Sequence, residues 1–183
     1  MAEALDYVTG FYKDGIADTN ADVSAGADIA DFVRQRQGQL IIDEIYHGLT
    51  YESDAPTACA AGDDIWVINS FSKYFQMTGW RLGWLVMPPA LAEAVERLAQ
   101  NVFLAPPTLA QYAALAAFRP ETLAVLEQRR AEFRCRRDTL MSLLAPLGFA
   151  FATEPDGAFY LYADVSALTD DSFAFCERLL AQA

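Results

Sequence analysis

Residues 69–84 read NSFSKYFQMTGWRLGW and set two serine hydroxyls, a lysine and an arginine between apolar side chains. DDIWVINSF (63–71), which overlaps its start, is an apolar run bounded by turn residues and predicts a buried strand. RLGWLVM (81–87) predicts another strand, stopped by Pro88. Lys73 is one of only two lysines in a chain with eleven arginines. Because an amine can lose its proton and a guanidinium cannot, a lysine in this position suggests amine chemistry.

Further elements are expected on both sides of this stretch. Upstream, QLIIDEIYHG (39–48) begins with four residues of strand character. Downstream, residues 148–153 and GAFYLYADV (157–165) have the alternation of a half-buried antiparallel pair. Helical patterns cover residues 29–37, 90–101, 108–118, 121–144 and a tail from 171. Helices between strands, and then a long helix leading to a hairpin, predict an α/β unit followed by part of an α+β unit.

The chain divides into three parts on this pattern. Residues 1–28 are acidic, rich in Gly, Ala and Asp, and show no sustained period, so we expect an irregular segment there. Residues 29–119 form the α/β part, and residues 120–183 form a linking helix with part of a small domain. The tryptophans are expected in the core: Trp66, Trp80 and Trp84.

Composition excludes several classes of function. The chain has 183 residues, 54% of them hydrophobic, so it can bury a sizeable core. Its net charge of -12 argues against a partner that is nucleic acid or an anionic membrane. Cys59, Cys135 and Cys176 have no metal-ligand spacing, so we expect no metal site, and their odd number argues against a disulfide scaffold. We read them as buried or incidental thiols. Without a signal-peptide pattern or a membrane-length apolar run, the expected location is the cytoplasm.

The polar residues that follow the first two strands form the candidate site. Ligands of α/β sheets bind outside the carboxyl ends of the strands, where these side chains would converge if the strands are neighbours. The candidates are Asp43, Tyr46, Ser70, Ser72, Lys73 and Arg81. This set is poor for hydrolysis, because the single histidine, His47, has no evident serine or cysteine partner. His47 itself fits a structural role better than a place in a substrate pocket.

The same set suits pyridoxal phosphate. Lys73 would supply the amine for a Schiff base, Asp43 a carboxylate for the pyridine nitrogen, and Tyr46 a phenol beside the ring hydroxyl. The two serines and Arg81 would hold the phosphate. Each residue also has an ordinary structural reading: Asp43 as the cap of a turn, Tyr46 as an aromatic at the edge of the core, and Arg81 as a surface charge.

Several segments resemble the class I/II aminotransferases, the fold-type I enzymes that use pyridoxal phosphate. The central ones are IIDEIYHGLTYE (41–52) and INSFSKYFQMTGWRLGWLVMP (68–88); NVFLAPPTLAQYAALAAF (101–118) and EPDGAFYLYADV (154–165) follow in family order. The resemblance implies a partial large domain, with a mostly parallel sheet and flanking helices, followed by part of a small α+β domain. Residues 29–119 would then belong to the cofactor-binding large domain.

The resemblance also implies roles for the candidates. Lys73 would be the Schiff-base lysine and proton shuttle, Asp43 would hold the pyridinium, and Tyr46 the ring oxygen. Ser70 and Arg81 would bind the phosphate, while Ser72 matches a variable position. The reaction implied is transfer of an amino group between an L-amino acid and a 2-oxo acid, in a homodimer that residues 101–111 would help to form.

The sequence also departs from the family pattern. Family members are longer, and their glycine-rich phosphate turn, stacking aromatic and Asn-Pro segment precede the motif of residues 41–52; residues 1–28 contain none of them. Past Tyr160 the only arginine is Arg178, outside any matching motif. We therefore expect a partial chain that leaves an apolar edge or face of the sheet open, binds the cofactor weakly or not at all, and self-associates or aggregates. The alternatives are an inactive remnant, another reaction of this fold type such as a β-lyase, and, least favoured by the acidic start, a transcription regulator.

Overall fold

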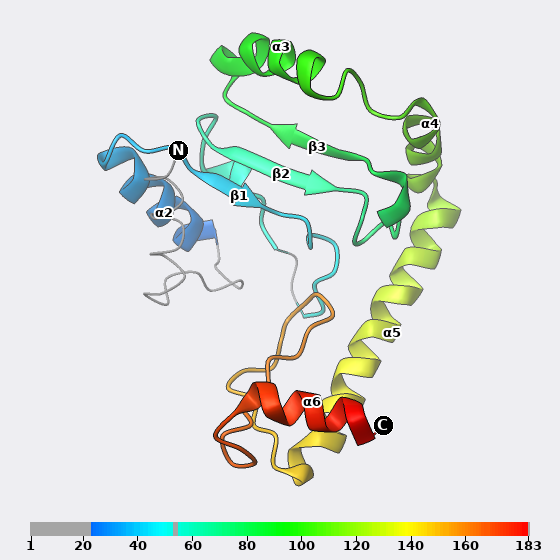
Figure 1. Cartoon of the computed structure of the whole chain (residues 1–183). Coiled ribbons are helices and arrows are strands. Elements are labelled where there is room, and N and C mark those ends of the chain that lie inside the picture. Colours follow the sequence, from blue (N-terminus) through cyan, green and yellow to red (C-terminus); the bar gives the residue numbers. More distant parts are fainter. Residues whose placement is uncertain (1–22, 53–54, 183) are drawn as a thin grey trace.

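A three-stranded sheet forms the centre of the computed structural model, which describes residues 23–52 and 55–182 (Figure 1). Strand β1 (Ile41–Asp43) pairs in parallel with β2 (Trp66–Ser70), and β2 pairs antiparallel with β3 (Gly83–Val86). The α/β class is confirmed, although the three described strands make one parallel and one antiparallel pair. Strands β2 and β3 lie within the predicted apolar runs, and β1 extends one residue past its predicted run, to Asp43.

The helices follow the predicted pattern with small shifts at their ends. They are α2 (Val23–Gln35), α3 (Ala92–Val102), α4 (Thr108–Ala117), α5 (Pro120–Leu144) and α6 (Ser172–Gln182), with short 3-10 turns η1 (Ala58–Ala61), η2 (Thr78–Trp80), η3 (Pro89–Leu91) and η4 (Ala145–Leu147). Helix α2 begins inside the segment 1–28 that was expected to be irregular, so the prediction is wrong for residues 23–28. Alanines favour a helix there despite a glycine. Residues 1–22 lie outside the described part of the chain.

The predicted hairpin of residues 148–165 is wrong. Ala150 and Asp164 exchange both backbone hydrogen bonds, at 2.9 and 2.7 Å, but they form a single bridge rather than a ladder. Gly157, which the hairpin would need, pairs instead with Thr50. Because Gly157 pairs with Thr50, residues 157–160 lie near the turn that follows β1, which is part of the candidate site.

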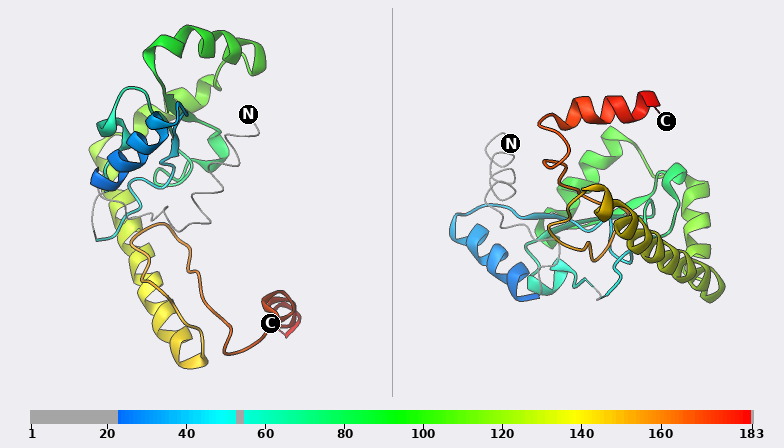
Figure 2. Two further views of the ribbon diagram at one scale, coloured as in Figure 1. Left: turned by 90° about the vertical axis from the view of Figure 1, so that its left-hand side faces the viewer. Right: turned by 90° about the horizontal axis from the view of Figure 1, so that it is seen from below.

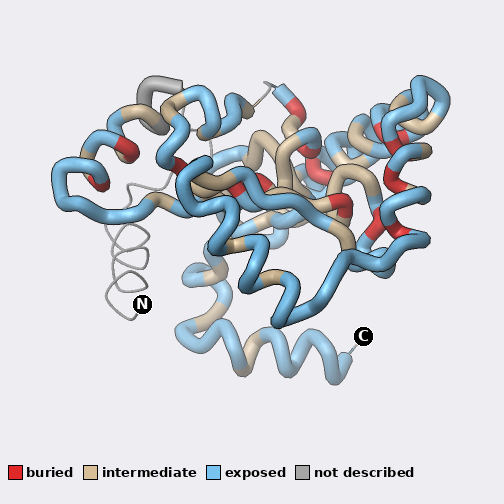
Figure 3. Tube along the Cα trace, turned by 90° about the horizontal axis from the view of Figure 1, so that it is seen from above, coloured by how far each residue is buried: buried red, intermediate tan, exposed pale blue. Residues whose placement is uncertain are grey.

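Two small clusters of buried residues make up most of the described core. Helix α2 and η1 cover one face of β1 and β2, where Ala30, Ile65 and Val67 are buried. On the other side, Phe71 and Met77 pack against Ala114 and Ala117 of α4. Buried positions are few along the chain trace (Figure 3).

The uncovered face of the sheet is apolar, as the sequence predicts. Strand alternation puts Ile41, Ile68 and Leu85 on the face opposite to Val67, and each is exposed. Trp80 and Trp84 are exposed as well, so the expectation that these tryptophans lie in the core is wrong. All three cysteines are exposed, so of the two readings, buried or incidental thiols, the structure excludes the first. The described chain provides no layer over Ile41, Ile68 and Leu85, whereas Trp84 is on the Val67 face and its ring contacts Phe71.

Helix α5 leads away from the sheet towards the chain's C-terminal elements. It starts beside α4 and runs away from the strands, and the segment after it leads to α6, which also lies far from the strands (Figures 1 and 2). Across the residues that the structure describes, no helix is both long and apolar enough to cross a membrane.

Candidate active site

Lys73 lies just beyond the carboxyl end of β2, beside two aromatic rings that contact each other. Its Nζ is 5.3 Å from the ring centre of Tyr46 and 5.4 Å from that of Phe159. Phe159 in turn contacts Phe133 of α5, with ring centres 5.7 Å apart. The strand and two distant segments thus place one half-buried amine against aromatic faces, an arrangement that attracts a cation and shields it from water.

Asp43 and Tyr46 belong to the turn that follows β1. Asp43 Oδ1 accepts a hydrogen bond from the backbone N–H of Ile45 at 3.0 Å, which is the turn-capping role considered from the sequence. Its Oδ2 makes no hydrogen bond with any other described residue, and the side chain is exposed. The hydroxyls of Tyr46 and Tyr160 are hydrogen-bonded, with their oxygens 3.0 Å apart. Burial, this hydrogen bond and the negative charge of Asp43 together raise the pKa of Tyr46 to about 12.

The serines and Arg81 occupy the connection between β2 and β3. Ser70 Oγ lies 2.8 Å from Ser72 Oγ, accepts from the Ser72 N–H at 3.0 Å, and is 3.1 Å from the Leu82 carbonyl oxygen. The Arg81 Nη1 donates to the Thr78 carbonyl oxygen at 3.0 Å. The chain returns to Ser70 at residue 82, but no hydrogen bond joins the Arg81 side chain to either serine.

A glycine makes this return possible. A Cβ on Gly83 would lie only 2.7 Å from the Asn69 carbonyl oxygen, closer than real Cβ contacts come. The glycine of the RLGW stretch is therefore needed for β3 to pair with β2. Arg81 itself has a positive φ of 53°, a conformation that non-glycine residues rarely adopt.

Glu44 is a buried residue of the site that the sequence reading did not single out. Only 5% of it is exposed, and its carboxylate accepts from the Ala58 N–H at 2.6 Å and from the Thr57 hydroxyl at 3.0 Å. His47 Nδ1 lies 3.2 Å from Glu44 Oε2, which supports the structural reading of His47. Glu44 thus ties the turn carrying Asp43 and Tyr46 to η1. The only sequence signal for a role of Glu44 was its position directly after Asp43.

Residues 156–160 were also missed as part of the site. The Ala158 N–H donates to the Leu49 carbonyl oxygen at 2.8 Å, and the Tyr51 N–H donates to the Asp156 carbonyl oxygen at 2.9 Å. The Tyr51 hydroxyl also donates to the Ala158 carbonyl oxygen. This anchor carries the rings of Phe159 and Tyr160 to Tyr46. The resemblance of the segment to the family was the available signal, but it did not identify these contacts.

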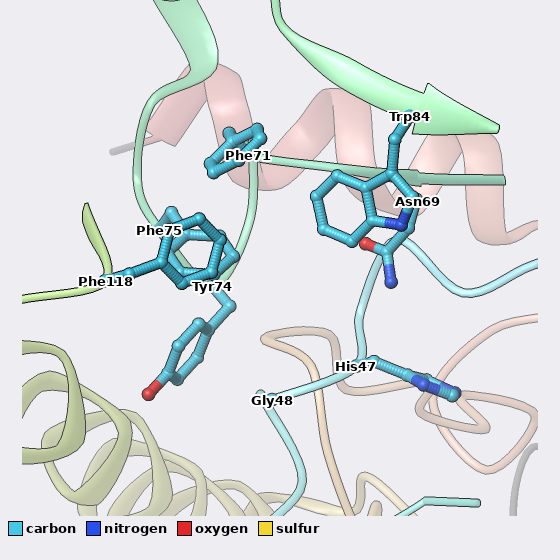
Figure 4. A pocket seen from close by; sticks show the side chains of 8 residues that line it. All are labelled: His47, Gly48, Asn69, Phe71, Tyr74, Phe75, Trp84 and Phe118. Carbon is cyan, nitrogen blue, oxygen red and sulfur yellow. The ribbon is translucent and has the colours of Figure 1, made fainter. Parts of the chain in front are cut away.

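Beside the site, a hollow of about 520 Å³ is lined mainly by aromatic side chains (Figure 4). His47 and Gly48 come from the turn after β1, Asn69 and Trp84 from β2 and β3, and the others from the Lys73 stretch and the end of α4: Phe71, Tyr74, Phe75 and Phe118. A Cβ on Gly48 would meet the Tyr74 ring at 2.7 Å, so this glycine keeps the two segments in contact.

The arrangement brings most of the predicted residues together. Lys73 contacts the Tyr46 ring, and Ser70 contacts Ser72. Within the described residues, Asp43 and Arg81 make no hydrogen bond or ion pair with the other candidates. An amine, a phenol and a hydroxyl pair at the carboxyl ends of two adjacent parallel strands can bind a polar aromatic molecule that carries an anionic group.

Comparison with known proteins gives consistent results. Residues 19–183 match the family model of aminotransferase class I and II. Over 157 residues the chain is 46% identical to valine–pyruvate aminotransferase of Mycobacterium tuberculosis, covering 85% of this chain and 40% of that protein. It is 36% identical over 145 residues to aspartate/prephenate aminotransferase of Thermus thermophilus, covering 77% of this chain and 37% of the relative.

Solved structures give the same result. A crystal structure of an aminotransferase from Mycobacterium tuberculosis superposes with a TM-score of 0.82 at 44% identity, over 86% of this chain and 41% of that one. Aspartate aminotransferase from Thermus thermophilus with maleate gives 0.79 at 32% identity, over 86% and 42%. The chain thus spans about 40% of the length of the proteins that it matches.

Proposed function

Because the chain belongs to the class I and II aminotransferases, we propose that it carries the lysine and cofactor-binding part of an enzyme that moves an amino group between an L-amino acid and a 2-oxo acid. The fold, the order of the motifs and the cluster around Lys73 support this proposal. We propose the substrates by chemical class only: an L-amino acid and a 2-oxo acid.

The cofactor that we propose is pyridoxal 5'-phosphate. When bound, it supplies an aldehyde that captures amines and a ring that withdraws electrons from the α-carbon of the substrate. The residues present fit this group. The Lys73 amine lies against the Tyr46 ring. The Asp43 carboxylate is at the end of the neighbouring strand, and one of its oxygens makes no hydrogen bond within the described chain. The hydroxyl oxygens of Ser70 and Ser72 lie 2.8 Å apart.

In this proposal Lys73 holds the cofactor through its amine and then moves the proton at the substrate's α-carbon. Arginine could do neither, because it stays protonated. Asp43 keeps the pyridine nitrogen protonated, since a nearby negative charge favours the protonated form. The Tyr46 hydroxyl donates to the ring oxygen.

In this proposal the connection between β2 and β3 binds the phosphate of the cofactor. Ser70 and Ser72 would donate their hydroxyls to it, and Arg81 its guanidinium, which suits a doubly charged anion. Arg81 is exposed, and its present bond to the Thr78 carbonyl oxygen is one that a phosphate could replace.

The observation that carries the proposal is the position of the Lys73 amine against the rings of Tyr46 and Phe159. The protein should be incubated with pyridoxal phosphate, treated with borohydride and digested. The label should appear on the peptide that contains Lys73. Lys73→Arg keeps the charge without a usable nucleophile and should take up no label. Label on Lys13, or equal labelling of the variant, would overturn the assignment.

We also propose that the working enzyme is a homodimer that uses the surface of α3 and α4. This surface is apolar and exposed over residues Leu98, Val102, Phe103, Leu104, Leu109, Tyr112 and Leu115. Exposed apolar side chains gathered within one stretch of the chain are typical of an interface. Light scattering should give a mass above the 20.2 kDa of one chain. A monodisperse 20.2 kDa particle would contradict the proposed dimer.

A further inference from the structure

Tyr160 is fixed beside Tyr46 by more than the contact between their hydroxyls. The two rings meet edge to face, with centres 5.9 Å apart and planes at 78°. The anchor of residues 156–158 on residues 49–51 determines where Tyr160 lies. Gly157 permits this anchor, because a Cβ there would be 2.7 Å from the Leu49 carbonyl oxygen. A residue 114 positions away along the chain is therefore held against Tyr46.

The hydrogen bond between the two phenols raises a question of proton direction. A tyrosine hydroxyl has one proton to donate and lone pairs to accept. The two hydroxyl oxygens are 3.0 Å apart, a separation at which either phenol can be the donor. In the cofactor-free protein the raised pKa of Tyr46 favours Tyr46 as the donor. The proposed function requires Tyr46 to donate to the ring oxygen of the cofactor, and Tyr46 can then stay bonded to Tyr160 only by accepting the proton of Tyr160.

We propose that Tyr160 is a positioning residue for Tyr46: it accepts the Tyr46 proton in the cofactor-free protein and donates its own proton to Tyr46 when the cofactor is bound. This inference rests on the proposed function of Tyr46. The reversal keeps the Tyr46 phenol in one place in both states. It also makes Tyr46 a better donor in the loaded protein, because a phenol that accepts a hydrogen bond gives up its own proton more readily.

Three ionisable groups face Tyr46, and only one is removed in the test. They are Asp43 in the same turn, Lys73 at the end of β2, and Tyr160 from the later segment. Tyr160→Phe removes one hydroxyl and keeps the ring that packs against Tyr46 and Phe159. Tyr162→Phe is the matched control, because Tyr162 lies two residues further on and is 96% exposed.

The first measurement uses the cofactor-free protein. Alkaline titration of tyrosine absorbance is recorded for each protein and for the same protein with Tyr46→Phe, and the difference isolates the Tyr46 step. Tyr160→Phe should lower the pKa of Tyr46 by about one unit, the size expected for a lost hydrogen bond to the neutral form. Tyr162→Phe should leave it unchanged. An identical Tyr46 step in the two variants would overturn the pairing.

The second measurement adds pyridoxal phosphate and follows the visible absorption of the bound cofactor against pH. Tyr160→Phe should raise the midpoint of that titration, because the weakened donor Tyr46 stabilises the deprotonated ring oxygen less. An unchanged midpoint would overturn the reversal. If neither wild type nor variant binds pyridoxal phosphate, the proposed function fails and the reversal with it, while the first titration still decides the pairing.

Discussion

Arg137 offers the sharpest test of how the later segment is held to the site. It is only 6% exposed and sits on α5, where its Nη1 donates to the Pro155 carbonyl oxygen at 2.5 Å. Its Nη2 pairs with Glu154 at 2.8 Å, and its guanidinium lies 5.0 Å from the ring centre of Tyr51. Arg137→Met removes the charge and the donors and keeps most of the apolar stem.

The expected loss of stability follows from these contacts. A hydrogen bond from a charged donor contributes about 1.5–3 kcal/mol, and breaking a fully buried ion pair costs about 3–5 kcal/mol. The acidic partners Glu52, Asp138 and Glu154 keep side-chain exposures of 49%, 54% and 61%, so they regain water when the arginine is lost. The cost should therefore lie near the lower range, about 2 kcal/mol.

Urea unfolding at a fixed protein concentration measures this difference. With a dependence of about 2 kcal/mol per molar urea, the midpoint should fall by about 1 M. Arg136→Met is the control, because Arg136 is exposed and its pair with Glu132 spans one helical turn. Such pairs contribute only about 0.3–0.5 kcal/mol. Equal midpoint shifts for the two variants would refute the reasoning that burial of Arg137 anchors residues 154–155.

Three further predictions concern single residues. Asp43→Asn can still cap its turn, so cofactor binding should persist while transamination slows by about 100-fold, the usual loss for one preorganised electrostatic partner; a normal rate would reduce Asp43 to a turn residue. Gly83→Ala should destabilise the sheet by roughly 1–3 kcal/mol in thermal unfolding, because the new Cβ would lie 2.7 Å from a backbone oxygen of β2; Gly79→Ala, with nothing within 4 Å, should be neutral. The hydrogen bond from Arg34 lowers the pKa of Asp64, so the Arg34–Asp64 pair stabilises the fold at neutral pH, and this stabilisation is lost as the pH falls through the lowered folded-state pKa. The unfolding midpoints of wild type and Asp64→Asn should therefore differ at pH 7 and converge in acid. A difference between the midpoints that persisted in acid would contradict this account.

Sequence reasoning succeeded where the signal is local. The apolar run around Val67 and the periodic pattern of residues 121–144 fix a strand and a helix without knowledge of their neighbours. The Lys73 amine and its adjacent serines come from one short stretch, so their proximity follows from chain connectivity. Convergence with the turn after β1 was inferred from the rule for parallel strands, and the register of Asp43 beside Ile68 agrees with it.

It failed where a segment could choose between partners. The alternation in residues 157–165 is compatible with any strand, and the structure pairs Gly157 with Thr50 rather than within a hairpin. The burial of Glu44 depends on donors 13 and 14 residues away, which no spacing rule specifies. Trp84 is an apolar residue of a type that is usually buried, yet it is exposed. Burial also requires other elements to cover the side chain, and the sequence of the strand alone does not specify them.

The long helix α5 has a mechanical consequence. Its 25 residues extend about 37 Å at 1.5 Å per residue. Glu127 accepts a hydrogen bond from the Tyr74 hydroxyl, Arg130 donates to the Thr50 carbonyl oxygen, and Arg137 pairs with Glu52, so the helix is tied to the sheet side along most of its length. Only the part beyond Arg137, about 10 Å long, is a free lever, and a tilt of about 5° there would move its end by about 1 Å. The helix therefore acts as a brace that makes Tyr74, one residue from Lys73, and residues 50–52 move together.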